Sequence, residues 1–194
     1  MTAPVTASDP PRAGSRRHPS LPEAPASAAL PTRVVGIDPG LHITGYACVD
    51  LAVGSSDPKL VEAGVIRLRA SDPLEQRLRQ LDGDLEAILE EFQPTRLAVE
   101  VVFVHRDFAR TAVLMAHARG VVLLAGARRR LPLDELPPAL VKKAMTGRGR
   151  ATKQQMQYAV MAQCGLAAPP NPPDVADAIA IALTSARRLM WKAL

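Results

Sequence analysis

Two acidic residues stand at the ends of two apolar runs that are typical of β-strands. Residues 34–37 form a compact apolar run that ends at Asp38, and residues 97–99 form another that ends at Glu100. Neighbouring strands of a sheet could bring these carboxylates within a few ångströms of each other, where they repel unless a cation or a proton lies between them. The structural alternative for Asp38 is capping of the turn that it begins with Pro39 and Gly40.

Two further acids, Asp174 and Asp177, lie three residues apart in a segment of helical composition, so they project from one face of the expected helix. The residues around them, 175–182, are otherwise small or apolar, which indicates that part of this turn faces the protein interior. An acid that faces a core needs a partner. The structural alternatives are capping of the helix by Asp174 and an ion pair for Asp177.

Four carboxylates without His or Cys favour a hard ion such as Mg²⁺ or Mn²⁺ over zinc. Paired hard ions near a basic surface are a known solution for phosphodiester hydrolysis. Lys and Arg outnumber Asp and Glu by 24 to 19, and the sequence pI is about 9.7, which favours a polyanionic partner without requiring one. The only two cysteines, Cys48 and Cys164, are far apart, so neither a disulfide framework nor a zinc site is indicated.

The elements that must position these acids follow from periodicity and turn signals. Residues 33–38, 42–51 and 60–68 predict a three-stranded meander, and leucines spaced by three or four residues predict a helix over 74–92. We then expect a strand at 96–100, a helix to about 130, a short strand within 131–136, and helices after residue 138, over 152–164 and from 173. This order predicts an α/β fold in which helices flank a five-stranded mixed sheet.

Residues 1–32 are rich in Pro, Ala and Ser, so we expect a disordered tail followed by one catalytic domain over residues 33–194. Close to half of the chain is hydrophobic, which suits a single domain with a core of useful size. No apolar run approaches the length needed to cross a bilayer, so we expect a cytoplasmic protein without membrane contact.

Several short motifs together resemble the RuvC family of Holliday junction resolvases (crossover junction endodeoxyribonucleases), which have a ribonuclease H-like fold. The resemblance runs from about Val34 to Thr184. It is carried by Gly36-Ile37-Asp38-Pro39-Gly40 with Thr44-Gly45-Tyr46, by Ala98-Val99-Glu100 with Val102-Phe103, by Ala118-Arg119-Gly120, by residues 147–154, and by Asp174-Val175-Ala176-Asp177-Ala178.

The resemblance implies roles for individual residues. Asp38, Glu100, Asp174 and Asp177 match the catalytic, metal-binding acids of the family, and Lys142 and Lys153 match its two basic residues near the scissile strand. A fixed ammonium there would stabilise charge that develops on the phosphate. For both lysines, an ordinary surface charge is the alternative.

The resemblance also implies DNA contacts. Phe103 matches an aromatic residue that stacks on an opened base, with core packing as the alternative. Other basic residues are expected to hold phosphates without reading sequence, or else to be solvated charges. This set comprises Lys143, Arg148, Arg150 and Arg128 to Arg130, beside Lys142 and Lys153.

By resemblance, the chain is a structure-selective endonuclease that acts in recombination and DNA repair. We expect a homodimer that nicks two strands of a four-way junction symmetrically, with Mg²⁺ or Mn²⁺ as cofactor, two ions in each active site, and 5′-phosphate and 3′-hydroxyl products. Residues 108–125 are the candidate dimer interface, because their run of Ala, Val and Leu exceeds one core-facing stripe. Partnership with the RuvA-RuvB branch-migration complex is implied by the family alone.

Two positions depart from the family pattern: Asp107 stands where Asn is common, and Ala116 where Gly is common. They put junction contact and dimer packing in doubt, not the reaction. Three other functions compete with the nuclease hypothesis. An actin- or sugar-kinase-like ATPase would need a second related domain, a junction-binding protein that does not cleave predicts loss of at least one acid, and a nuclease of this fold acting on RNA is disfavoured only by the resemblance.

Overall fold

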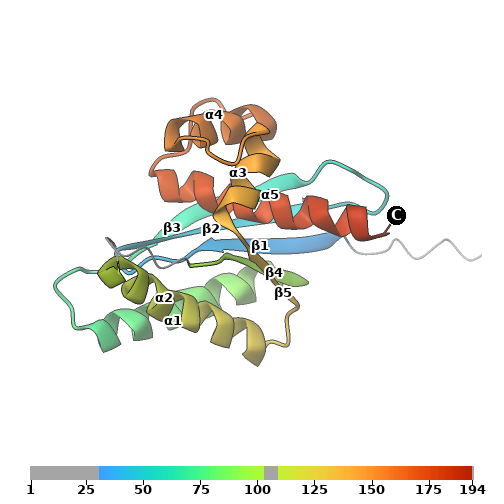
Figure 1. Ribbon diagram of the computed structural model, residues 1–194. Coiled ribbons are helices and arrows are strands. Elements are labelled where there is room, and N and C mark those ends of the chain that lie inside the picture. The colour runs from blue at the N-terminus through green and yellow to red at the C-terminus, as the bar shows by residue number, and fades with distance from the viewer. Residues whose placement is uncertain (1–30, 103–108, 194) are drawn as a thin grey trace, which may run out of the picture.

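The computed structural model describes residues 31–102 and 109–193, and within these a five-stranded mixed sheet has the strand order β3-β2-β1-β4-β5 (Figure 1). The elements follow the predicted order. They are β1 (Thr32–Asp38), β2 (Ile43–Leu51), β3 (Lys59–Arg67), α1 (Leu74–Phe92), β4 (Arg96–Glu100), α2 (Ala109–Arg128), β5 (Leu133–Leu136), α3 (Pro138–Thr146), α4 (Lys153–Cys164) and α5 (Pro173–Ala193). The predicted fold class is confirmed. Residues 1–30 of the expected tail and Phe103 lie outside the described residues, and Thr32, expected to end the tail, begins β1 instead.

Strands β1, β2 and β3 form the predicted antiparallel meander, and β4 and β5 add to its other side in parallel with β1. In the parallel pair β1 and β4, Ile37 lies opposite Val99, so the next residues, Asp38 and Glu100, end neighbouring strands at the same edge. The carboxyl ends of parallel strands are a common place for a binding site in α/β proteins.

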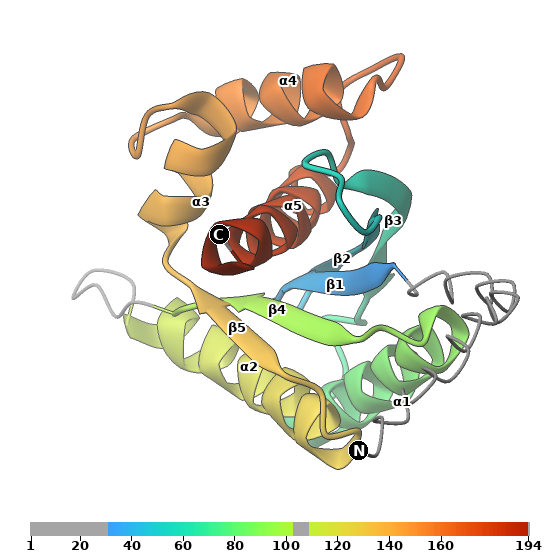
Figure 2. The same ribbon diagram turned by 90° about the vertical axis from the view of Figure 1, so that its right-hand side faces the viewer.

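Helices cover both faces of the sheet, with α1 and α2 on one face and α5 on the other (Figures 1 and 2). Because successive side chains of a strand point to opposite faces, each face receives its own core. Val35 and Ile37 of β1 pack on the side of α1 and α2, whereas Val34 packs with the apolar residues of α5. Strand β1 is therefore apolar on both faces, and so is its neighbour β4, which explains the uninterrupted apolar runs of these two strands.

Two glycines let α5 lie directly on the strands. A Cβ at Gly36 of β1 would stand 2.5 Å from the backbone nitrogen of Ala182, and one at Gly45 of β2 would collide with the carbonyl oxygen of Asp174. Any other residue at either position would force the helix away from the sheet. The first turn of α5 is consequently fixed against the end of β1.

The opposite layer is joined by ion pairs at the carboxyl end of α2. Arg128 Nη1 lies 2.8 Å from Asp82 Oδ1, and Arg129 Nε donates to Glu86 Oε2 at 2.9 Å, with both acids on α1. These two arginines therefore link the end of α2 to α1. Every helix in the described part of the chain is too short or too polar to span a membrane.

Candidate active site

Asp38 and Glu100 face the same side of the sheet. On β1, Val35 and Ile37 point toward α1 and α2, so Asp38 points to the other face of the sheet. On β4, Leu97 and Val99 point toward α1 and α2, so Glu100 also points to the other face. Strand alternation therefore directs both carboxylates toward the α5 layer, at adjacent strand ends.

Asp174 and Asp177 come to the same place because α5 begins there. Gly45 is the antiparallel partner of Asp38, and the backbone of Asp174 rests on Gly45. Asp177 follows one turn later on the helix face that meets β1. The close approach of α5 thus delivers two acids to the two strand ends.

The turn after Asp38 is held at three successive residues. The buried Thr44 hydroxyl donates to the carbonyl oxygen of Gly40 at 2.6 Å and accepts from its N–H at 3.1 Å. Arg77 Nη1 of α1 donates to the Leu41 carbonyl oxygen at 3.0 Å. The N–H of Leu68, the residue after β3, donates to the His42 carbonyl oxygen at 2.9 Å. These bonds to three separate segments fix the loop that carries the first acid.

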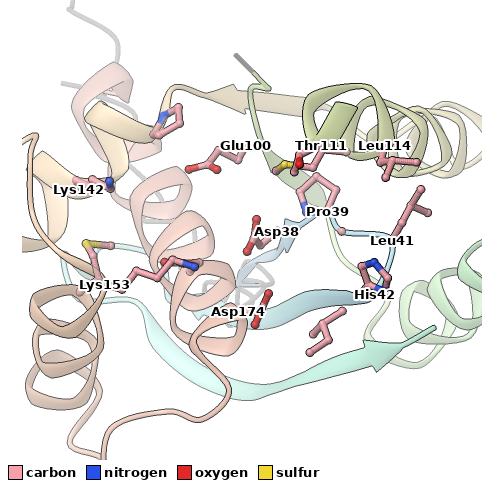
Figure 3. Close-up of a pocket in the computed structure, with 16 residues that line it drawn as sticks. Asp38, Pro39, Leu41, His42, Glu100, Thr111, Leu114, Lys142, Lys153 and Asp174 are labelled. Atoms are coloured by element: carbon pink, nitrogen blue, oxygen red, sulfur yellow. The ribbon is translucent and has the colours of Figure 1, made fainter. Parts of the chain in front are cut away.

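The acids open into a pocket of about 500 Å³ between α5, the two strand ends, and helices α2, α3 and α4 (Figure 3). Lys142 on α3 and Lys153 at the start of α4 point toward the acids from one side (Figure 3). The lining residues are Asp38, Pro39, Gly40, Leu41, His42, Ile43, Glu100, Thr111, Leu114, Met115, Pro138, Lys142, Lys153, Met156, Asp174 and Asp177.

Burial and repulsion between neighbouring acids make Asp38, Glu100 and Asp177 hard to ionise. Burial raises the pKa of Asp38 well above its ordinary value, and three neighbouring carboxylates raise it further. Burial and the charge of Asp177 raise the pKa of Glu100 from 4.5 to about 7, and burial also raises the pKa of Asp177. A carboxylate cluster of this kind gains stability from a cation or from protons.

The two lysines oppose these shifts. The positive charge of Lys153 lowers the pKa of Asp38, Glu100 and Asp177, and that of Lys142 lowers the pKa of the last two. Lys153 is the first residue of α4, whose start is fixed by a complete capping box: the Thr152 hydroxyl accepts from the Gln155 N–H at 3.2 Å, and the Gln155 side chain accepts from the Thr152 N–H at 2.9 Å. The cap thus fixes the backbone from which the Lys153 side chain extends into the pocket.

Other predicted DNA-binding residues are not in the pocket. Lys143, Arg148 and Arg150 are exposed on α3 and on the loop between α3 and α4, outside the lining. The sequence did not predict the part of the lining that comes from Leu41, His42 and α2. Nothing in a single sequence shows that the turn after β1 lies beside α2.

The donor set fits a hard divalent cation in chemical type, since all four groups are carboxylates. Across the described ranges, no three acidic, His or Cys side chains converge closely enough to hold an ion as they stand. Ion binding therefore requires side-chain rotations that draw the carboxylates together, which a cation would favour by offsetting their repulsion.

Comparisons with known proteins agree with this geometry. Residues 34–185 match the family model described as crossover junction endodeoxyribonuclease RuvC. The chain is 46% identical over 161 residues to a protein of that name from Rhodopirellula baltica, covering 82% of this chain and 86% of the relative. A second relative of that name, from Magnetococcus marinus, is 40% identical over 165 residues, covering 85% and 89%.

Solved structures show the same fold. RuvC from T. thermophilus in complex with a Holliday junction substrate aligns with a TM-score of 0.75 at 31% identity, covering 83% of this chain and 96% of that one. The yeast mitochondrial Holliday junction resolvase Ydc2 aligns with a TM-score of 0.58 at 16% identity, covering 87% of each chain, which shows likeness of fold alone. The α/β fold is therefore ribonuclease H-like, as predicted.

Proposed function

The chain belongs to the RuvC family of crossover junction endodeoxyribonucleases, and on that premise we propose that it resolves Holliday junctions by metal-dependent hydrolytic nicking of two strands. The single observation that carries the proposal is the presence of four carboxylates and two lysines in the lining of one pocket. This combination suits a phosphodiester, because the acids can hold cations while the ammonium groups face the anionic strand.

Each group has a distinct task in the proposed reaction. Asp38, Glu100, Asp174 and Asp177 bind Mg²⁺ or Mn²⁺, with two ions in each site as the working expectation. When bound, these ions supply an activated water and offset the charge on the phosphate oxygens. Water attacks phosphorus, the bond to the 3′ oxygen breaks, and the products carry a 5′-phosphate and a 3′-hydroxyl.

The lysines stabilise the charge that develops on the phosphate. Lys153 is the stronger candidate because its backbone lies at a capped helix start and its charge lowers the pKa of three of the acids. Lys142 acts from α3, on the same side of the pocket (Figure 3). A charge held in place before the reaction is more effective than one that must be ordered during it.

The assembly belongs to the same proposal. Symmetric nicking of a two-fold junction requires two active sites, so we expect a homodimer, with the exposed apolar residues Val113 and Leu124 of α2 in the candidate interface. Cytoplasmic location, and cooperation with a RuvA-RuvB branch-migration complex, follow from the family. Lys143, Arg148 and Arg150, on the side of the pocket where α3 and α4 lie, would contact phosphates beyond the scissile one.

The competing functions account for fewer observations. A junction-binding protein without catalysis predicts the loss of an acid, whereas all four are present and face one pocket. An ATPase of the actin or sugar-kinase type would use a second related domain, whereas the match to the RuvC family model takes up residues 34–185.

Cleavage of a synthetic four-way junction, compared with a linear duplex of the same sequence, tests the proposal. We expect paired nicks in the junction alone with Mg²⁺ or Mn²⁺ and none with EDTA. Asp38→Asn, Glu100→Gln and Asp177→Asn should each abolish cleavage and retain junction binding, whereas the exposed control Glu90→Gln should cleave normally. Junction binding by the unmodified protein without cleavage in either metal would instead support the non-catalytic alternative.

A further inference from the structure

The two lysines of the pocket lie on helices that differ in how they begin. The capping box fixes the start of α4, where Lys153 lies. Helix α3, which carries Lys142, is only nine residues long, and its N-cap residue, Pro137, makes no side-chain capping hydrogen bond. A helix this short is marginal by itself and depends on packing for its stability. The position of Lys142 therefore depends on what holds the rest of α3.

The last turn of α3 is held from two other helices. The final four carbonyl groups of a helix lack partners within it. One of these groups, the carbonyl of Met145, accepts a hydrogen bond at 2.7 Å from Gln163 Nε2, near the end of α4. Gln163 Oε1 in turn accepts from Arg187 Nη1 of α5 at 2.7 Å, and the same Nη1 atom lies 3.9 Å from Met145 Sδ. We call Arg187, Gln163 and the Met145 carbonyl group the latch.

The latch gives the Gln163 amide a defined orientation. An amide has one end that donates and one that accepts, whereas the Arg187 guanidinium only donates. The bond from Arg187 therefore holds the amide oxygen toward α5 and leaves the NH₂ group directed at α3. Met145 itself is 4% exposed and belongs to the core that α3 shares with α5. The latch thus closes over a packed contact and opposes movement of α3 along α5.

Helix α5 connects the latch to the acids. Its first two turns carry Asp174 and Asp177, and Arg187 lies ten residues after Asp177, about 15 Å along the same helix. Helices α3 and α4 pack against α5, which lies between them and the sheet (Figures 1 and 2). Lys142 points from α3 toward the acids (Figure 3), and its charge lowers the pKa of Glu100 and Asp177. One helix thus places two acids near its start and holds α3 near its end.

We propose, on the basis of the nuclease function above, that Arg187 is a positioning residue: through Gln163 it holds α3 so that the Lys142 ammonium stays beside the carboxylates and the scissile phosphate. Arg187 and Gln163 both lie outside the pocket lining, so neither contacts a phosphate bound in that pocket. A charge stabilises a transition state best when it is in place before the reaction. Loss of the latch should consequently slow cleavage without weakening binding of the junction.

Single-turnover cleavage of a four-way junction at saturating protein and Mg²⁺ or Mn²⁺, compared with junction affinity in EDTA, tests this role. Arg187→Met removes the latch, and Arg187→Lys keeps one donor. Gln163→Glu still accepts from Arg187 but cannot donate to the Met145 carbonyl oxygen. Arg187→Met is also combined with Lys142→Met. Arg188→Met is the matched control, because this neighbouring arginine of α5 projects in a different direction, and thermal unfolding checks that each variant is folded.

We expect Arg187→Met and Gln163→Glu each to slow cleavage by about tenfold, on the scale of the factor that one hydrogen bond to a charged group provides. Arg187→Lys should slow it by about threefold or less, since it retains a charged donor. Junction affinity should be unchanged in all three. Lys142→Met should slow cleavage at least as much as Arg187→Met, which should then add about twofold or less in that background, because effects that pass through one group are not additive.

Several results would overturn this inference and leave the nuclease function intact. They are an unchanged cleavage rate in Arg187→Met or Gln163→Glu, an undiminished effect of Arg187→Met in the Lys142→Met background, and a loss of junction affinity that matches the loss of rate. Equal slowing by Arg188→Met would also overturn it, because the cause would then be the positive charge of α5 in general. If the unmodified protein cleaves no junction with either metal, the nuclease proposal fails, and the role of Arg187 in that reaction fails with it.

Discussion

Replacing Glu100 by Gln should make the metal-free protein more stable at alkaline pH. In the folded protein, burial and the Asp177 carboxylate raise the pKa of Glu100 from 4.5 to about 7. The folded state therefore holds a proton that the unfolded state releases at lower pH. As pH rises from about 4.5 through 7, the contribution of Glu100 to the free energy of unfolding falls, because the folded state must ionise a buried group.

The size of this effect follows from the shift. Each pKa unit corresponds to about 1.4 kcal/mol, so a rise from 4.5 to about 7 predicts a loss on the order of 3 kcal/mol across that window. Gln resembles the protonated acid in shape and cannot ionise, so Glu100→Gln avoids the loss. The variant should equal the unmodified protein near pH 4 and exceed its stability by roughly that amount near pH 8.

Urea unfolding in EDTA, followed by circular dichroism at several pH values, measures this difference. Glu90→Gln is the matched control, because Glu90 is exposed on α1 and its removal should give no pH-dependent difference. Addition of Mg²⁺ or Mn²⁺ should stabilise the unmodified protein by mass action and the Glu100→Gln variant much less. A stability difference that stays constant from pH 4 to pH 8 would refute the argument that Glu100 is destabilised by burial among acids.

Three further outcomes follow from the site and its supports. Lys153→Met should slow cleavage at saturating metal by about a hundredfold or more, because it removes a preorganised charge. Lys143→Met should have little effect on the cleavage step. Equal effects of the two variants in single-turnover assays would argue against the assignment of Lys153 to the pocket. Gly45→Ala should lower the free energy of unfolding by about 1 to 3 kcal/mol, because its Cβ meets the start of α5, whereas Gly83→Ala in α1 should raise it by roughly 0.5 to 1 kcal/mol. Phe103→Ala should slow junction cleavage by about tenfold without changing affinity for linear duplex, and an unchanged cleavage rate would make Phe103 a packing residue.

The strand-end acids could be predicted from sequence because the rule that places them is local. An apolar run that ends at Asp38 or Glu100 fixes the side chain at a strand end, and parallel pairing then brings the two ends together. The helical spacing of Asp174 and Asp177 likewise fixes a shared face. The sequence motifs did not reveal why α5 reaches the strand ends, which depends on the missing side chain of Gly45.

Other features depend on contacts between segments that are distant in the sequence, so they could not be predicted from the periodicity of the residues. Arg128 and Arg129 form part of a basic run in the sequence, but the pairing of α2 with α1 places them beside Asp82 and Glu86. His42 is an isolated histidine in a turn, and it lines the pocket because α2 packs beside that turn.

The most direct test of the central claim is the fate of a supercoiled plasmid that extrudes a cruciform, incubated with the protein and Mg²⁺ or Mn²⁺. Paired nicks across the four-way junction convert the plasmid to a linear product with ligatable 5′-phosphate ends, and we predict that product for the unmodified protein and none for Asp38→Asn or with EDTA. Open circles alone, or linear product from Asp38→Asn, would contradict the proposal that four carboxylates in this pocket drive paired cleavage of a junction.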